Sequence, residues 1–444
     1  MAQSATRLSG YLTAPAGAFF GGLIALDIVL LFAVSGYVLI EAGWNYGDAG
    51  GSPLEKIHPA TMLAALILLL TAMTAANPLV PLAKGFGERP RVVFYLATVF
   101  LMMAQAMLVV GLPFTVFIDT FIGPVLVFLF LAEVDEDRRR RLAWLIHGLF
   151  VVNSLLGIAE VGLGFRLTPL HIEGETLEEE WRASAFIGHP LSNAMLTGSY
   201  MVLLLSGGAR DLPQFLKPVL FLIAAAGMVV FGGRAATGLV VLFVVWHVLR
   251  RLVDVLRGRP FDAALVLLGL IGLPVLAGGV LVLADAGFFD KFLSRLVDDQ
   301  GSASTRVEMF EIFKHLTWAE ILLGPNADYV HNLMRHYGLD YGIESFWVAI
   351  VLSYGMIAGL VFFAGLFMFS ADVVKERPAS LAVMIYFFAV ASASLSLSAK
   401  THGFSMFIVM ILVLLPRGRA QEAAEVTSAP DAGQRAGRAR LQVA

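Results

Sequence analysis

Long apolar runs alternate with short polar segments along almost the whole chain. A helix needs roughly 20 mostly apolar residues to cross the hydrocarbon layer of a membrane. About twelve stretches fit this requirement, centred on residues 19–41, 58–82, 92–112, 114–132, 142–165, 189–206, 215–232, 235–249, 262–285, 343–370, 379–398 and 403–416. The pattern predicts an all-α polytopic membrane protein with about 12 transmembrane helices. Its first apolar segment is expected to be a retained span and not a signal peptide.

One polar segment interrupts the apolar pattern between Asp285 and Glu344. Apolar side chains recur within it at helical spacing, at Val307, Phe310, Ile312, Phe313 and Leu316. We therefore expect one large helical loop outside the bundle. The predicted organisation is a first part of the bundle with about nine spans (1–286), the large loop (287–342), the last three helices (343–416) and a disordered tail (417–444).

Composition supports a membrane protein and excludes several kinds of chemistry. The chain is 58% hydrophobic and 15% charged, whereas soluble domains are about 45–50% apolar and about 25% charged. It contains no cysteine, which excludes disulfides, thiolate catalysis and cysteine-based metal sites. His331 and His336 are badly spaced for shared metal ligation on a helix. No metal, cofactor or nucleic-acid partner is expected.

Lysine and arginine gather in alternate loops, which predicts the orientation of the chain. The positive-inside rule places these clusters in the cytoplasm, among them Lys84 to Arg91, Arg138 to Arg141, and Arg250 to Arg259. An even number of spans must separate the first two clusters, so residues 92–132 are divided near Pro113. Both termini are then cytoplasmic, and residues 287–342 lie on the outer side.

Five ionisable residues fall on the predicted outer side, in or next to the ends of spans. They are three arginines, a histidine and a glutamate: Arg182, His189, Arg234, Arg306 and Glu344. Arginine close to hydrocarbon is costly and signals a partner or an anionic ligand. The guanidinium group matches phosphate oxygens in a two-pronged geometry. A diphosphate is therefore a sensible ligand for this face.

Each of these residues also has a purely structural interpretation, which the sequence leaves open. The arginines can serve loop electrostatics or lipid contact: Arg182 with Glu178–Glu180, Arg234 by reaching to headgroups, and Arg306 with Glu308 or Asp298–Asp299. His189 can start a helix before Pro190, and Glu344 can favour a helix N-terminus. The lone Asp27 in the first span fits a helix–helix hydrogen bond as well as a function.

Four motifs, in this order, resemble the superfamily of O-antigen ligases and O-antigen or exopolysaccharide polymerases of bacterial envelopes. The first is Arg182-Ala-Ser-Ala-Phe-Ile-Gly-His-Pro-Leu-Ser-Asn193-Ala, which is similar to the start of a span in that family. The others are Phe231-Gly-Gly-Arg234, Thr305-Arg306 followed by Leu323-Gly324-Pro325, and Glu344-Ser-Phe-Trp at the start of a span. The resemblance covers residues 180–360, while the earlier spans are similar only in hydropathy.

The resemblance implies a membrane-embedded glycosyltransferase of the C-type fold that works without metal. Its donor would be an undecaprenyl-diphosphate-linked glycan at the periplasmic face, and a second glycan would be the acceptor. Arg306 and Arg234, then Arg182 with His189, would bind the diphosphate. Glu344 would be the first candidate for the catalytic base and His331 the second, in an inverting transfer.

Ligases commonly begin the last motif with His-Asn, where this chain has Glu344. We therefore expect a polymerase of O-antigen, capsule or exopolysaccharide repeats in the bacterial inner membrane. A flippase and a chain-length regulator are the candidate protein partners. The alternatives are an O-antigen ligase that transfers glycan to lipid A core, a membrane transporter, and a non-catalytic assembly subunit.

Overall fold

A computed structural model of the chain describes residues 16–47, 50–110, 114–168, 171–172, 175–176, 182–208, 210–258, 302–339, 342–394 and 397–418. The described part is helical except for a small antiparallel hairpin. In that hairpin, β1 (His171–Ile172) pairs with β2 (Glu175–Thr176), with His171 opposite Thr176. Apart from this two-stranded hairpin, the described residues confirm the prediction of an all-α protein.

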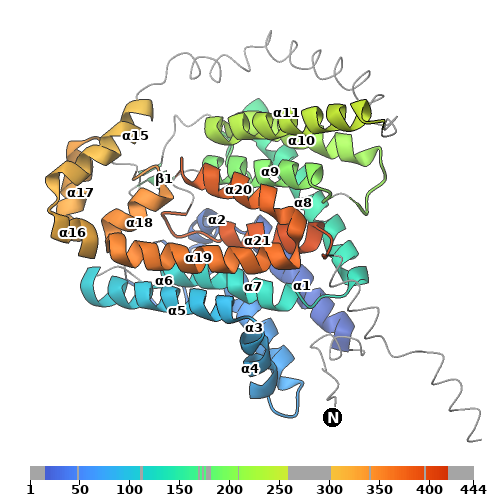
Figure 1. Cartoon of the computed structure of the whole chain (residues 1–444), viewed down its shortest axis with the longest axis horizontal. Coiled ribbons are helices and arrows are strands. Elements are labelled where there is room, and N and C mark those ends of the chain that lie inside the picture. Colours follow the sequence, from blue (N-terminus) through green and yellow to red (C-terminus); the bar gives the residue numbers. More distant parts are fainter. Residues whose placement is uncertain are drawn as a thin grey trace, which may run out of the picture.

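The described helices follow the apolar segments of the sequence (Figure 1). Their bounds are α1 (Ala16–Ala33), α2 (Gly36–Glu41), α3 (Pro59–Met73), α4 (Leu79–Gly87), α5 (Pro90–Gln105), η2 (Ala106–Val110), α6 (Thr115–Phe117), η3 (Ile118–Ile122), α7 (Gly123–Leu131), α8 (Glu136–Leu163), α9 (Pro190–Leu205), α10 (Leu216–Phe231), α11 (Arg234–Leu256), α15 (Ser302–Glu311), η5 (Ile312–His315), α16 (Trp318–Leu323), α17 (Ala327–His336), α18 (Phe346–Tyr354), α19 (Met356–Glu376), η6 (Pro378–Ser380), α20 (Leu381–Ala391) and α21 (Gly403–Leu414).

Three described helices are long and apolar enough to cross a membrane: Pro90–Val110, α8 and α19. Seven shorter apolar helices of 10–17 residues accompany them in the described part of the chain. A helix satisfies its own backbone polar groups, as a segment in lipid must. These helices are those of a membrane-associated protein. The predicted ninth span, residues 262–285, lies outside the described residues, as do Arg7 and residues 419–444 of the tail.

The last helix of the described residues, α21, forms the centre of the bundle. Every residue of α21 is buried, and the helix contacts α1, α7, α8 and α9. Phe407 stacks on Phe387 of α20 with ring centroids 3.9 Å apart. The core is therefore built around the element that comes last in sequence.

Three of the predicted spans are not continuous helices. Residues 19–41 divide into α1 and α2, where the Ser35 side chain accepts a hydrogen bond from Val38 N at the start of α2. Residues 58–82 divide at the segment between Met73 and Leu79. Residues 343–370 divide into α18 and α19 at Gly355, whose φ is +84°. The apolar pattern runs on across each break, so it predicted single spans.

Chain reversal at Gly355 is visible in side-chain contacts. A Cβ placed on Gly359 would lie 3.4 Å from Ile350 and 3.5 Å from Val351. Nine residues of straight helix would span roughly 13.5 Å. The chain therefore bends back at Gly355, and Gly359 lets α19 pack closely against α18.

The described part of the large loop, residues 302–339, is helical as predicted, and it forms what we call the cap: α15, η5, α16 and α17. Its core contains Met309, Ile312, Leu316, Val330 and Leu339, and the same cluster includes Ile343 and Leu352 from the α18 region. The cap is therefore docked on the bundle and is not a separate domain. Figure 1 shows the cap at one end of the bundle, at the left of the view, which we call the cap end.

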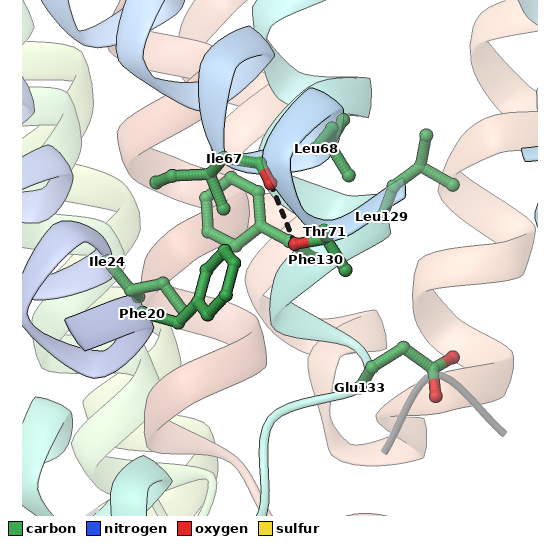
Figure 2. A pocket seen from close by; sticks show the side chains of 8 residues that line it. All are labelled: Phe20, Ile24, Ile67, Leu68, Thr71, Leu129, Phe130 and Glu133. Atoms are coloured by element: carbon green, nitrogen blue, oxygen red, sulfur yellow. Dashed lines mark hydrogen bonds between the residues drawn. The ribbon is translucent and has the colours of Figure 1, made fainter. Parts of the chain in front are cut away.

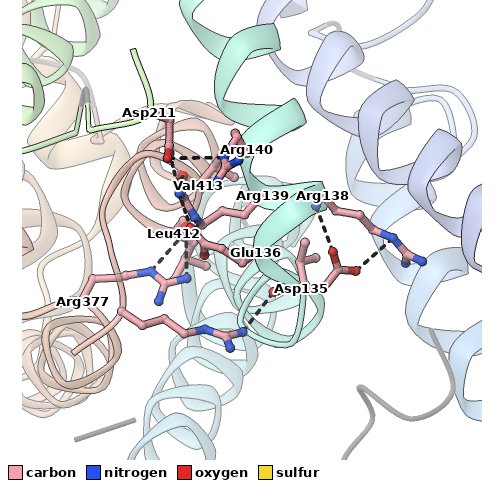
Figure 3. Close-up of polar contacts among 11 residues, drawn as sticks. Asp135, Glu136, Arg138, Arg139, Arg140, Asp211, Arg377, Leu412 and Val413 are labelled. Carbon is pink, nitrogen blue, oxygen red and sulfur yellow. Dashed lines mark hydrogen bonds and ion pairs between the residues drawn. The ribbon is translucent and has the colours of Figure 1, made fainter. Parts of the chain in front are cut away.

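The opposite end, which we call the arginine end, holds a network of arginines around the last turn of α21 (Figure 3). Arg139 donates to Val413 O (2.6 Å) and pairs with Glu136 (2.6 Å) and Asp211 (2.5 Å). Arg377 donates to Leu412 O from both Nε (3.2 Å) and Nη2 (3.0 Å). The last carbonyl groups of a helix lack intrahelical partners, so these arginines satisfy the buried C-terminus of the central helix.

Candidate active site

The segment that carries Arg182 is held by a buried carboxylate from α8. Glu160 is 0% exposed and accepts hydrogen bonds from Leu167 N (2.8 Å), Ser184 N (2.9 Å) and Ala185 N (2.9 Å). Ala185 has φ +42°, a left-handed conformation that is uncommon for a residue with a Cβ. Such a conformation persists where the surroundings fix it. The hydrogen bonds to Glu160 fix this segment in its position.

Two buried asparagines hold the same segment from α8 and α9. Asn153 donates to Asn193 Oδ1 (2.8 Å) and accepts from Phe186 N (3.1 Å). Asn193 donates to Ser184 O (2.5 Å). Amides in apolar spans are the signal that sequence reasoning missed at Asn153, whereas Asn193 lies inside one of the four motifs.

The turn that carries Arg234 lies against the Arg182 segment. Ala183 N donates to Val230 O (3.0 Å), which joins this segment to the end of α10. Gly233 contacts the Ala194 side chain of α9 so closely that a Cβ there would overlap it. The structure therefore brings two of the predicted arginine segments together, and the side chains of Arg182 and Arg234 are both partly exposed.

His189 starts α9, as the structural interpretation proposed. Its Nδ1 accepts a hydrogen bond from Leu191 N (3.2 Å), so the proton of the neutral ring is on Nε2. The ring stacks on Tyr37 with centroids 6.5 Å apart. A Cβ on Gly188 would lie 3.0 Å from the same tyrosine ring and would overlap Ser35. The Arg182 segment thus reaches the break between α1 and α2.

The remaining predicted residues lie in or beside the cap. Arg306 is on α15, and its side chain is outside the described part. His331 is exposed on α17, next to the buried Val330. Glu344 is partly exposed at the bend just before α18. Figure 1 places the start of α18 at the same end of the bundle as the α10–α11 turn and the cap.

Sequence reasoning missed a buried polar cluster, the Asp119 cluster, at the break between α1 and α2. Asp119 is 0% exposed and accepts hydrogen bonds from Tyr46 Oη (2.9 Å) and His58 N (3.1 Å). His58 Nε2 lies 2.6 Å from Val34 O, and its ring stacks on His402 at 4.3 Å. In the sequence, Asp119 and His402 are isolated polar residues near the ends of apolar runs. Nothing near either residue indicates that the two lie in one cluster.

Lys400 closes the Asp119 cluster from the loop between α20 and α21. Its ammonium group donates to Tyr46 O (2.9 Å) and to Lys56 O, lies 3.5 Å from the centre of the Tyr46 ring, and is 3.9 Å from Asp119. Burial lowers the pKa of Lys400 to about 8, although the charge of Asp119 opposes that shift. One lysine thus connects the α20–α21 loop with the α2–α3 loop and with η3, which lie far apart in sequence.

The two sets of polar contacts share the residues at the α1–α2 break. Val34 contacts His58 of the Asp119 cluster, while Ser35 and Tyr37 contact the Gly188–His189 part of the Arg182 segment. A Cβ on Gly36 would lie 2.6 Å from the Tyr46 ring. The Asp119 cluster and the Arg182 segment therefore meet at residues 34–37, which contact both of them.

Near the arginine end, by contrast, a small cavity is apolar. It has a volume of about 20 Å³ and is lined by Phe20, Ile24, Ile67, Leu68, Thr71, Leu129, Phe130 and Glu133 (Figure 2). The Thr71 hydroxyl is used locally, because it donates to Ile67 O (2.7 Å), and Glu133 pairs with Arg89 at 3.0 Å. This cavity offers little to a polar ligand.

The described residues contain no group of three or more histidine, aspartate or glutamate side chains arranged to hold a metal ion. Comparison of the chain with protein-family models, with curated proteins and with solved structures gives no match.

Proposed function

We propose that the protein is a membrane-embedded glycosyltransferase that polymerises undecaprenyl-diphosphate-linked oligosaccharide repeats. The observation that carries the proposal is the hydrogen bond from Ala183 N to Val230 O (3.0 Å). It holds the segments of Arg182 and Arg234 together at the cap end. Two guanidinium groups on adjacent, rigid turns are suited to the oxygens of one diphosphate.

In the proposed reaction, an acceptor hydroxyl attacks the anomeric carbon of the donor glycan. The bond from that carbon to the diphosphate oxygen breaks, and undecaprenyl diphosphate leaves. Arg182, Arg234 and Arg306 would stabilise the negative charge that develops on the leaving group. Glu344 would take the proton of the attacking hydroxyl, with His331 as the second candidate. Attack from the face opposite the diphosphate would invert the anomeric configuration.

The proposal includes about twelve spans in a C-type glycosyltransferase fold, with both termini in the cytoplasm of a bacterium. The cap would then face the periplasm. The arginine network at the opposite end supports this orientation, because arginine and lysine favour the cytoplasmic side. The donor would keep its polyprenyl chain in the bilayer while the sugar lies under the cap.

The test is chain growth by the purified protein with the lipid-linked repeat as sole glycan substrate. Polymer formed without lipid A core supports a polymerase, whereas transfer that occurs only when core is added identifies a ligase. Replacing Arg182 or Arg234 with alanine should lower turnover by about 100-fold or more. Arg141→Ala is the matched control, since Arg141 is exposed near the arginine end and should leave turnover unchanged.

Glu344→Gln should reduce turnover while donor binding is retained, because the amide cannot accept the proton. Unchanged turnover of the arginine variants would refute the diphosphate site. Unchanged turnover of the Glu344 variant would remove only the base assignment.

A transporter is the second candidate, and one observation favours it. Asp27 in α1 is 0% exposed, and neither of its carboxylate oxygens has a hydrogen-bond partner. The helix–helix hydrogen bond considered from the sequence is therefore not formed, and an unpaired acid inside a span is a typical transport residue. Proteoliposomes that move a fluorescent lipid-linked repeat between leaflets, and lose this activity with Asp27→Asn, would establish transport. A rate equal to that of protein-free liposomes would exclude it.

A further inference from the structure

The cap exposes large apolar side chains on α16, outside the apolar spans. Trp318 is 76% exposed, Leu323 is 66% exposed and Leu322 is 38% exposed. Three such residues among the six of α16 are unusual for a surface that faces only water, because exposed apolar patches on soluble surfaces mark interaction sites.

The end of α16 is fixed against the bend between α18 and α19. A Cβ on Gly355 would lie 2.5 Å from Leu323 C and 2.7 Å from Leu322 O, and it would also overlap Gly324 N. From the other side, a Cβ on Gly324 would lie 3.1 Å from Tyr354 C. Backbone contacts backbone at this point, so the end of α16 is fixed beside the first turn of α19.

The surface of the bundle next to the end of α16 is also apolar and exposed. The first turns of α19 expose Ile357 (52%) and Leu360 (60%). The end of Pro90–Val110, which is tied to the α18–α19 bend by Gln105 donating to Tyr354 O (2.8 Å), exposes Leu108 (84%) and Val109 (76%). Since both helices are long and apolar enough to cross a membrane, we expect these side chains to face lipid.

We infer that the exposed side of α16 lies in the bilayer interface beside the first turn of α19, so that the cap is anchored to the membrane surface. The partner is a lipid surface, because the α16 side chains continue a surface that already faces lipid. Tryptophan is favoured at the boundary between hydrocarbon and headgroups. Lys314 pairs with Glu311 at 2.6 Å, but its side chain is 70% exposed; it stands one turn before Trp318 and suits the phosphate level. The inference does not depend on the proposed glycosyl transfer.

The absence of cysteine from the chain allows a direct test on the full-length protein in phospholipid vesicles. A spin label is attached to Leu323→Cys, to Leu360→Cys as the lipid reference, and to Asp328→Cys, exposed on α17, as the water reference. Accessibility to oxygen and to a water-soluble nickel complex is then compared. We expect a ratio of oxygen to nickel accessibility at position 323 several-fold above that at 328 and close to that at 360.

A ratio at position 323 equal to that at position 328 would overturn the inference, because α16 would then face water. Exclusion of both reagents would also overturn it, because α16 would then be covered by protein, either another part of the chain or a second copy.

An independent measurement uses quenching of tryptophan fluorescence by lipids with brominated chains. The parent protein should show a quenched component that Trp318→Phe removes, strongest when bromine lies near the headgroups. Equal quenching of parent and variant would contradict membrane contact. Leu323→Cys and Trp318→Phe both replace exposed residues. An unchanged size-exclusion profile of each variant confirms that it folds.

Discussion

Glu160 illustrates at the residue scale why a charged group is kept inside a span. The sequence marks it only as an ionisable residue among apolar ones. In the structure its carboxylate accepts three backbone N–H groups and fixes the strained turn at Ala185. Glu160 is thus a positioning residue for the segment that carries Arg182. Its removal should affect both stability and activity.

We predict that Glu160→Gln lowers the free energy of unfolding by about 1–3 kcal/mol, because the amide presents a donor to backbone donors that it cannot satisfy. Thermal unfolding in detergent micelles measures the change. Glu88→Gln is the control, since the Glu88 side chain is 62% exposed and its loss should have little effect. Equal melting temperatures for the two variants would contradict the positioning role.

Lys400 gives a prediction about pH. Its pKa is lowered by burial to about 8 in the folded protein, against an ordinary value near 10.4. Between these values the unfolded chain binds more protons than the folded one, so stability should rise with pH from about 8 to about 10. Below pH 8 the lysine is charged in both states and contributes no slope.

The measurement is the difference in melting temperature between the parent and Lys400→Met as a function of pH. That difference should shift in favour of the parent as pH rises through the window from 8 to 10. The same comparison with Lys375→Met, at an exposed position of α19, should be flat. A flat difference for Lys400 as well would show that its pKa is not lowered.

At the scale of elements, the breaks in helices decide where functional segments lie. The apolar pattern predicts helices well, because lipid-facing and core-facing residues are both apolar. It does not predict the bend at Gly355, because that bend depends on Gly324, which arrives from the cap. Nor does it predict the contact between Asp119 in η3 and Lys400 in the α20–α21 loop, because nothing in the sequence around either residue indicates the other.

Gly355→Ala should weaken the attachment of the cap. The substitution adds a Cβ where φ is +84° and where the Leu323 and Gly324 backbone already lies, so we expect a loss of at least about 1 kcal/mol. Limited proteolysis should then cut within α16 and α17 faster than in the parent.

Gly359→Ala is the matched control one turn later. Its added Cβ would make ordinary contacts at 3.4 and 3.5 Å with Ile350 and Val351, and alanine favours a helix over glycine. It should be neutral or slightly stabilising. Equal protease sensitivity of the two variants would contradict the docking of the cap at Gly355.

At the scale of the whole molecule, the arginines at the two ends of the bundle have different surroundings. The cap end holds partly exposed arginines on a fixed support, whereas the arginine end uses its guanidinium groups to complete the fold. Burial lowers the pKa of Arg377 to about 10, which still leaves it charged at neutral pH. The positive-inside pattern predicts a cytoplasmic position for these arginines, but it gives no indication that some of them cap the central helix.

Arg139→Met should therefore destabilise the whole bundle by about 3 kcal/mol, because it leaves Val413 O without its partner and Asp211 with only the longer ion pair to Arg140 (3.5 Å). Arg141→Met, at an exposed position two residues away, should have little effect. Thermal unfolding followed by both tryptophan fluorescence and helix content tests this, and the two signals should move together. Loss of stability with Arg141→Met of the same size would point to net charge as the cause.

The central place of α21 has a consequence for biosynthesis. Membrane helices are inserted in order as the ribosome makes them, and yet the helix that α1, α7, α8 and α9 surround emerges after all of them. The earlier helices must remain in the bilayer with their inner faces incompletely covered until residue 414 has been made. Native packing around α21 can thus be completed only after these earlier helices have been made, and a ribosome that stalls before α21 would leave the bundle without its central helix.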